Sequence, residues 1–241
     1  MTITWTRAVA WGILAVLCGL GFAVYRGTLT VPEHLNPWAP LDVMAPPNAL
    51  TDFKLTRARS EPLRCKAALA QTGMQYDEVP DRVTGAGCGF DDAVRLRNAP
   101  VRFGAPLTLS CPMALSFFMW ERNVLQPAAT QHFGQPVVSI EHLGSYACRN
   151  INRGERETVA ASASRSRHAT ANALDLAGVT LRDGRRVSVL KDWTASDDDA
   201  RLLHDLHRGA CRYFDGVLGP DYNAVHRDHF HLETGGFSMC R

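Results

Sequence analysis

The stretch SRHATANALDLAG, residues 166–178, places a histidine and an aspartate seven positions apart among small and aliphatic residues. Alternate residues of a strand share a face, so Asp175 would lie on the same side as Ala173 and Ala177. These small neighbours leave space beside the carboxylate, and His168 can fold over the same face from the loop that enters the strand. The stretch therefore predicts a strand that carries a pair of ligands, His168 and Asp175.

A second cluster of polar residues, HRDHFHLE, occupies residues 226–233 near the C-terminus. On a strand, His229 and His231 would share one face, with their Cα atoms about 6.5 to 7 Å apart and both rings within reach of one ion. With nine histidines in the chain, this pair alone is weak evidence for a site. His226 and Asp228 precede the strand and could either orient its histidines or form a surface turn.

Hydrophobic periodicity and capping residues predict the rest of the framework. An Asp-rich run at residues 197–199 is typical of a helix start, and it lacks the glycine of an EF-hand calcium loop. We expect an α+β domain with a small antiparallel sheet and flanking helices. Its other elements would be a helix over 111–134 that is capped by Ser110 and interrupted near Pro127, a helix over 196–214 capped by Ser196, and strands over 136–143 and 185–190.

The N-terminal part of the chain differs in character from the rest. After a short tail, residues 1–7, residues 8–25 carry no charge and are closed by an arginine at each end. Their length suits a transmembrane anchor, with a cleaved signal peptide as the alternative. Residues 26–60 are proline-rich and predict an extended stalk, which leaves residues 61–241 for the domain.

The cysteine count indicates an exported domain. Cys18 lies in the apolar segment, and none of the other six forms a compact zinc-ligand spacing, so disulfides are favoured over buried thiols. Six cysteines allow 15 pairings, among which we favour sequential pairing. The net charge is only +2, and the Lys and Arg residues are scattered rather than gathered into a basic stripe, so nucleic acid is not expected as a partner. The six are Cys65, Cys88, Cys111, Cys148, Cys211 and Cys240.

Several stretches together resemble the bacterial extensin-like C-terminal domain family over roughly residues 61–241. They are CPMALSFFMW, EHLGSYACRNIN, RHATANALDLAGVTLRDGRRVSVLKDW, GACRYF and LGPDYNAVHRDHFHLE. The pattern S-x-H-x-x-small-x-A-x-D, followed by HFH, also resembles the zinc signature of the lysostaphin, D-alanyl-D-alanine metallopeptidase and hedgehog superfamily. This resemblance implies a hedgehog-like fold.

The resemblance also implies roles for individual residues. His168, Asp175 and His231 would hold Zn²⁺ and leave its fourth tetrahedral position open, as catalytic zinc sites do. His229 would stay unligated and act as a base or stabilise an oxyanion. Two neighbours depart from the expected setting: the superfamily commonly has glycine where this chain has Ala171, and Arg167 places a cation beside His168 unless its side chain points away.

Other residues are weaker candidates. Arg149 could bind a substrate carboxylate or oxyanion through its bidentate fork, with Tyr146 nearby, although a structural role beside Cys148 is equally open. His204 and His207 have H-x-x-H spacing on a helix and form a rival metal pair.

These features predict a zinc-dependent hydrolase of peptide bonds in peptidoglycan. It would act on stem peptides or cross-links, held to the inner membrane by its N-terminal helix with the domain in the periplasm. If the segment is cleaved, the domain would be free in the periplasm. The alternative is a non-hydrolytic module that keeps the fold and binds the cell envelope.

Overall fold

The computed structural model describes residues 2–151, 164–236 and 238–241. The chain divides into two compact units, Met1–Ala39 and Pro40–Arg241. Each unit is described by itself below.

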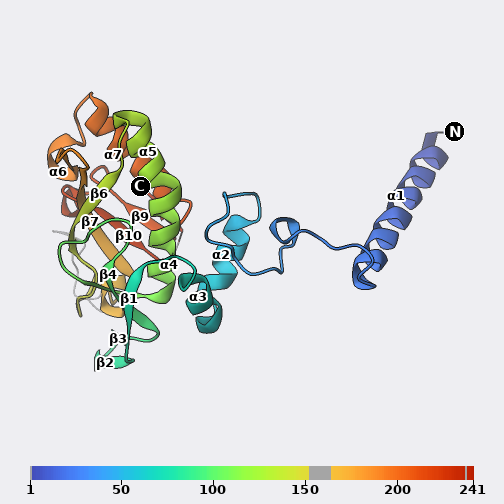
Figure 1. Cartoon of the computed structure of the whole chain (residues 1–241), viewed down its shortest axis with the longest axis horizontal. Helices are drawn as coiled ribbons and strands as arrows, with labels where there is room; N and C mark the ends of the chain where they lie inside the picture. The colour runs from blue at the N-terminus through green and yellow to red at the C-terminus, as the bar shows by residue number, and fades with distance from the viewer. Residues whose placement is uncertain (1, 152–163, 237) are drawn as a thin grey trace. The chain divides into compact units, whose positions relative to one another are not determined.

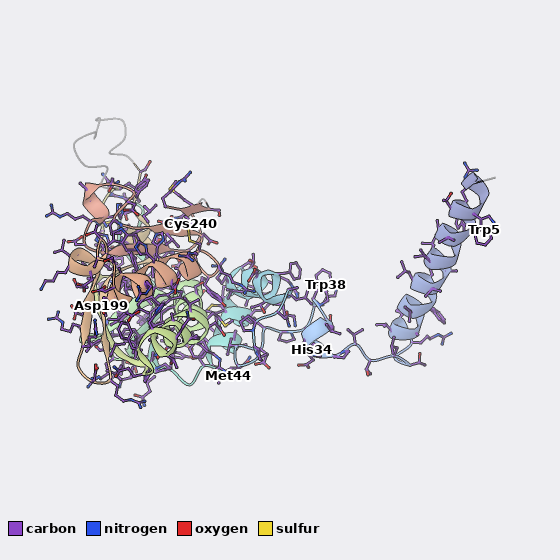
Figure 2. All side chains as sticks on the ribbon, turned by 90° about the horizontal axis from the view of Figure 1, so that it is seen from above. Trp5, His34, Trp38, Met44, Asp199 and Cys240 are labelled. Atoms are coloured by element: carbon purple, nitrogen blue, oxygen red, sulfur yellow. A yellow bond between two sulfur atoms is a disulfide. The ribbon has the colours of Figure 1, made fainter. Side chains whose placement is uncertain are left out.

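The first unit consists of one long helix, α1 (Thr2–Tyr25), followed by the short 3₁₀ helix η1 (Glu33–Leu35). The segment Trp5–Tyr25 is long and apolar enough to cross a membrane, as an anchor or as a signal sequence. Its apolar side chains, such as that of Trp5, stand exposed around the helix (Figure 2). The helix starts earlier than expected, because it includes residues that we assigned to the tail.

The second unit has the expected α+β composition. Its helices are α2 (Thr51–Arg59), α3 (Pro62–Leu69), α4 (Cys111–Trp120), α5 (Gln126–Phe133), α6 (Val189–Asp192) and α7 (Asp198–Ala210). Two 3₁₀ helices, η5 (Arg167–Thr170) and η6 (Ala224–His226), precede strands of the main sheet. Figure 1 labels the α-helices of the second unit.

The strands of the described residues form three sheets. A three-stranded sheet has the order β1 (Gln75–Val79), β4 (Ala93–Asn98), β5 (Leu107–Ser110), and β2 (Arg82–Gly85) pairs with β3 (Cys88–Phe90) in a hairpin. The main sheet has the order β11 (Met239–Cys240), β9 (Gly216–Leu218), β10 (Phe230–Glu233), β7 (Ala173–Leu181), β6 (Val137–Gly144), and β8 (Arg186–Ser188) also pairs with β7. All pairs in the main sheet are antiparallel except β11 with β9.

Helices α4 and α5 form one continuous rod (Figure 1). Ser110 caps it as expected, with its hydroxyl accepting a hydrogen bond from the Met113 amide, and Gly134 ends it with φ of 66°. The interruption expected near Pro127 is a π-helix, η2 (Glu121–Leu125). Because the i→i+5 pattern rearranges the hydrogen bonds just before Pro127, the rod tolerates a residue that lacks an N–H.

The rod is the centre of the hydrophobic core. Almost every residue of α4 is buried, as is typical of a helix that is apolar on all sides. Phe117 and Trp120 are among the largest fully buried side chains, and the Trp120 indole N–H donates to the Leu206 carbonyl of α7 at 3.2 Å. The core therefore joins the rod to α7.

Helix α7 is shorter at both ends than the helix predicted over 196–214, because it spans Asp198–Ala210. Asp197, not Ser196, caps the helix by accepting hydrogen bonds from the amides of Asp199 and Ala200. The Asp-rich run therefore begins a helix, as expected. Towards the other end, Gly209 lies against Val124 of η2 so closely that a Cβ atom at this position would be 2.4 Å from Val124 Cγ1.

Part of the proline-rich stretch belongs to the second unit. Residues 40–60, which we assigned to the stalk, belong to the second unit, where Leu41, Val43 and Leu55 are buried in the core. The part of these residues before α2 forms neither a helix nor a strand, so its sequence lacks periodicity, yet its apolar side chains still pack.

Three disulfides join Cys65 to Cys111, Cys88 to Cys148, and Cys211 to Cys240, while Cys18 is free. The disulfide framework is confirmed. Sequential pairing is wrong for the first two bonds, because β3 meets the loop after β6 and α3 meets the start of α4. In the chain-entropy account, a disulfide that closes a loop of this length stabilises the folded state by about 3 to 5 kcal/mol.

Candidate metal centre

The pairing of β7 with β10 brings the two polar stretches together. His231 is the direct cross-strand partner of Asp175. Residues opposite each other in an antiparallel pair share a face, so the carboxylate and the imidazole meet on one side of the sheet. His231 Nδ1 lies 2.9 Å from Asp175 Oδ1.

His168 completes the group from η5, which lies immediately before β7. Its Nε2 lies 3.1 Å from Asp175 Oδ1 and 3.2 Å from His231 Nδ1. The three residues are buried, with at most 8% of each residue exposed. Among the described residues they form a group whose ligand atoms lie within 4.8 Å of one another, so it could hold a metal ion.

The His168 ring is fixed in one orientation. Its Nδ1–H donates to the Ser145 carbonyl at 2.9 Å, and a carbonyl can only accept. When the ring is neutral, Nε2 therefore presents a lone pair to the Asp175 carboxylate and to His231, and when the ring is protonated, Nε2–H donates to the carboxylate. Such a cluster of electron-pair donors needs a cation at its centre, either a proton or a metal ion.

The metal-free protein meets this need with a proton. Burial opposes ionisation, but hydrogen bonds with His168 and His231 hold the pKa of Asp175 below its usual range. Burial of His231 works against its charged form too, but hydrogen bonds to Asp175 and Glu233 raise its pKa to about 9. A cationic His231 therefore neutralises the buried carboxylate.

The two residues that depart from the superfamily pattern, Ala171 and Arg167, both lie in the turn before β7. Ala171 has φ of 55°, in the left-handed region that favours glycine. The Arg167 side chain lies beside Gly235 and Gly236 and lines a separate cavity, away from the three ligand atoms. Its charge therefore does not face the metal centre.

His229 lies at the edge of the metal centre. Its Nε2 is 3.5 Å from Asp175 Oδ1, and its Nδ1–H donates to Asp228 Oδ1 at 2.8 Å. Asp228 therefore orients His229. Of the two alternatives for Asp228, a partner of the histidines or part of a surface turn, this contact favours the first. His226 packs near His229 and His231, with ring centroids 5.3 and 5.9 Å away. Burial and these two rings lower the pKa of His226 to about 4.

Arg149 stands at the mouth of the group. Its Nη2 lies 4.0 Å from Asp175 Oδ2, and its side chain is 42% exposed. The loop that carries it is held by the Cys88–Cys148 disulfide and by Tyr146, whose ring packs edge-on against Phe90 and whose hydroxyl bonds to Thr84. Tyr146 therefore braces the loop, and Arg149 places its guanidinium near the site.

The rival pair, His204 and His207, does not join this group. His204 packs on the Trp193 ring at 4.0 Å between centroids, and His207 Nε2 hydrogen-bonds to the Arg241 carbonyl at 3.0 Å. Their rings are occupied by packing and backbone contacts.

A cavity of about 580 Å³ lies on the other side of the turn that carries His168. Its walls include Arg59, Arg82, Arg167 and Asn172, and none of the three ligand residues lines it. The metal centre and this cavity are therefore separate features of the domain.

The sequence did not point to two residues of the site. Ser145 contributes only a backbone carbonyl, which any residue could supply. Glu233 accepts a hydrogen bond from His231 Nε2–H at 2.9 Å, and its position two residues after His231 on a strand was the available signal.

Comparison with known proteins gives one match. The family described as "Extensin-like protein C-terminus" matches residues 63–241. No curated protein and no solved structure matches the chain.

Proposed function

This chain belongs to the extensin-like C-terminal family, and we propose that it is a zinc-dependent hydrolase of peptide bonds in peptidoglycan. The observation that carries the proposal is the convergence of His168, Asp175 and His231, with His229 beside them. The proposal includes the finer relationship that the motifs suggest, a place in the lysostaphin, D-alanyl-D-alanine metallopeptidase and hedgehog superfamily with a hedgehog-like fold.

The spacing of the three ligand atoms fits zinc. Tetrahedral zinc with bonds of about 2.0 to 2.1 Å keeps neighbouring ligand atoms about 3.3 Å apart. The atoms of His168, Asp175 and His231 are separated by 3.1, 3.2 and 2.9 Å, so small outward shifts would suffice. Two imidazoles and one carboxylate, with a position left open, are also typical of catalytic rather than structural zinc.

When bound, zinc would supply Lewis-acid chemistry for the activation of water and the polarisation of an amide carbonyl. The protein residues would then provide proton transfer and substrate binding. His229 Nε2 takes the proton of the water that adds to the carbonyl and later returns it to the leaving amine. Asp228 holds the His229 ring with Nε2 directed inward, and Arg149 binds a substrate carboxylate or the developing oxyanion.

The envelope is the setting that the other features support. The disulfides favour an oxidising compartment, and α1 is apolar and long enough to serve as an inner-membrane anchor or export signal. Peptidoglycan stem peptides and cross-links offer amide bonds and free carboxylates in that compartment. The domain would therefore meet its substrate in the periplasm.

Metal analysis and digestion of sacculi test this proposal. The full chain, purified in detergent, should bind close to one zinc, and His168→Ala and Asp175→Ala should abolish binding. His229→Ala should retain zinc but release muropeptide products about 10² to 10⁴ times more slowly. An exposed-site variant, Asp77→Ala, serves as the control and should match the wild type. Absence of bound metal in the wild type would remove the hydrolase proposal.

The cavity beyond the His168 turn favours a second candidate function. Its separation from the metal centre suits a module that binds cell-envelope material without cleaving it. Co-sedimentation with sacculi that leaves all muropeptides intact, while zinc is retained, would support this candidate over hydrolysis.

A further inference from the structure

We infer that Glu233 is a positioning residue, which fixes the ring nitrogen that His231 turns towards the metal centre. The inference rests on the proposed function, because it assigns a partner to one of the proposed zinc ligands. Nothing in the sequence motif itself gives Glu233 a role.

The contact between the two side chains sets the tautomer. Glu233 Oε2 lies 2.9 Å from His231 Nε2, while His231 Nδ1 faces Asp175. Because the carboxylate accepts the Nε2–H, the neutral ring keeps its lone pair on Nδ1, where a metal ion would bind. Carboxylate partners of this kind also raise the basicity of a ligating imidazole.

Strand geometry places Glu233 for this contact. Residues 231 and 233 of β10 lie on the same face, and the direct partner of Glu233 across β7 is Ala173. A methyl side chain opposite Glu233 leaves room for the carboxylate to turn towards His231. The glutamate side chain is 21% exposed, which places it at the margin of the buried group.

Two glycines supply the rest of the space. A Cβ atom on Gly216 would lie 2.5 Å from Glu233 Cγ, and a Cβ atom on Gly236 would lie 2.2 Å from Glu233 Oε1. Neither distance is possible without displacement of the glutamate. The side chain therefore occupies a space that the backbone of β9 and the segment after β10 leaves free for it.

Zinc affinity of the full chain, measured by chelator competition, tests the inference. Glu233→Ala should weaken binding 10- to 100-fold, and Glu233→Gln, which keeps an acceptor but loses the charge, should fall between Ala and wild type. Gly236→Ala should also weaken binding, because it displaces the carboxylate without removing it. Glu141→Gln on β6 and Gly85→Ala, whose Cβ atom would meet only ordinary contacts, are the matched controls.

A spectroscopic measurement separates positioning from general stability. Long-range proton–nitrogen NMR of the zinc-loaded wild type should show His231 protonated at Nε2 and metal-bound at Nδ1. In Glu233→Ala this single state should give way to a mixture, while circular dichroism of the metal-free protein stays unchanged. If Glu233→Ala and Gly236→Ala both kept wild-type zinc affinity and a single Nδ1-bound state, the inference about Glu233 would be overturned but the proposed function would stand. Failure of the wild type to bind zinc would overturn the proposed function as well.

Discussion

Asp175 and His231 face each other directly across the antiparallel pair of β7 and β10, with Oδ1 and Nδ1 2.9 Å apart. The strand register thus builds half of the metal centre. A slip of one residue would turn either side chain to the opposite face of the sheet, so the fold and the site depend on the same pairing.

The contact between Asp228 and His229 predicts a partial catalytic defect. Asp228→Asn preserves an acceptor for His229 Nδ1–H but removes the charge that supports proton uptake at Nε2. Product release from sacculi should fall about tenfold, less than the loss expected for His229→Ala. Zinc content should not change. Asp91→Asn, at an exposed position, is the control, and equal rates for the two variants would contradict the role of Asp228.

The buried carboxyl of Glu121 predicts a pH-dependent stability. Burial raises its pKa, although a hydrogen bond from Gln126 and the charge of Arg122 oppose the shift. Because the folded pKa exceeds the unfolded value, the contribution of Glu121 to stability is present at low pH and is lost as the pH rises through the folded pKa. Glu121→Gln should therefore gain stability relative to wild type between pH 4 and pH 8. Urea unfolding of both proteins across this range measures the difference, and a constant difference would refute the explanation.

The close approach of Gly209 to Val124 predicts a compensating pair of substitutions. Gly209→Ala improves helix propensity by about 1 kcal/mol but forces its new methyl group into Val124, at a cost of about 1 to 3 kcal/mol. Val124→Ala in the same chain should recover much of this loss. A double-mutant cycle of unfolding free energies checks the coupling, which should vanish if the two helices do not meet here.

The Cys88–Cys148 disulfide predicts a link between oxidation and metal binding. Ser145, whose carbonyl holds His168, lies in the loop that this bond ties to the β2–β3 hairpin. Replacing both cysteines by serine should lower zinc affinity about tenfold, as for loss of other supporting contacts. Replacement of Cys211 and Cys240 should lower the free energy of unfolding by about 2 to 5 kcal/mol, as loss of other disulfides does, and should leave zinc affinity unchanged. Equal affinities in both double variants would exclude this link.

Strand alternation was sufficient to predict that Asp175 and His231 each lie on a strand. It could not predict that the strands are neighbours, and only the resemblance to zinc peptidases placed His168, Asp175 and His231 in one group. The disulfide pairing depends on which segments meet in space, so chain order gave wrong partners to four cysteines, Cys65, Cys88, Cys111 and Cys148. The α+β class and the apolar helix at the N-terminus are confirmed.

Other differences have local causes. Ser196 and Asp197 are both good caps, so the choice between them depends on the approach of the preceding chain. The part of residues 40–60 that precedes α2 shows no helical or strand period, because packing of an irregular segment leaves no such pattern in the sequence.

The π-helix between α4 and α5 gives the rod one surplus residue. Deleting a single residue from Glu121–Leu125 could turn this segment into a regular α-helix and still leave α4 joined to α5. The proline at the start of α5 would then meet the carbonyl four positions before it, at a cost of about 3 kcal/mol. The proline is thus tolerated because the extra residue is present, and a chain that lost this residue in the course of evolution would be under pressure to lose the proline as well.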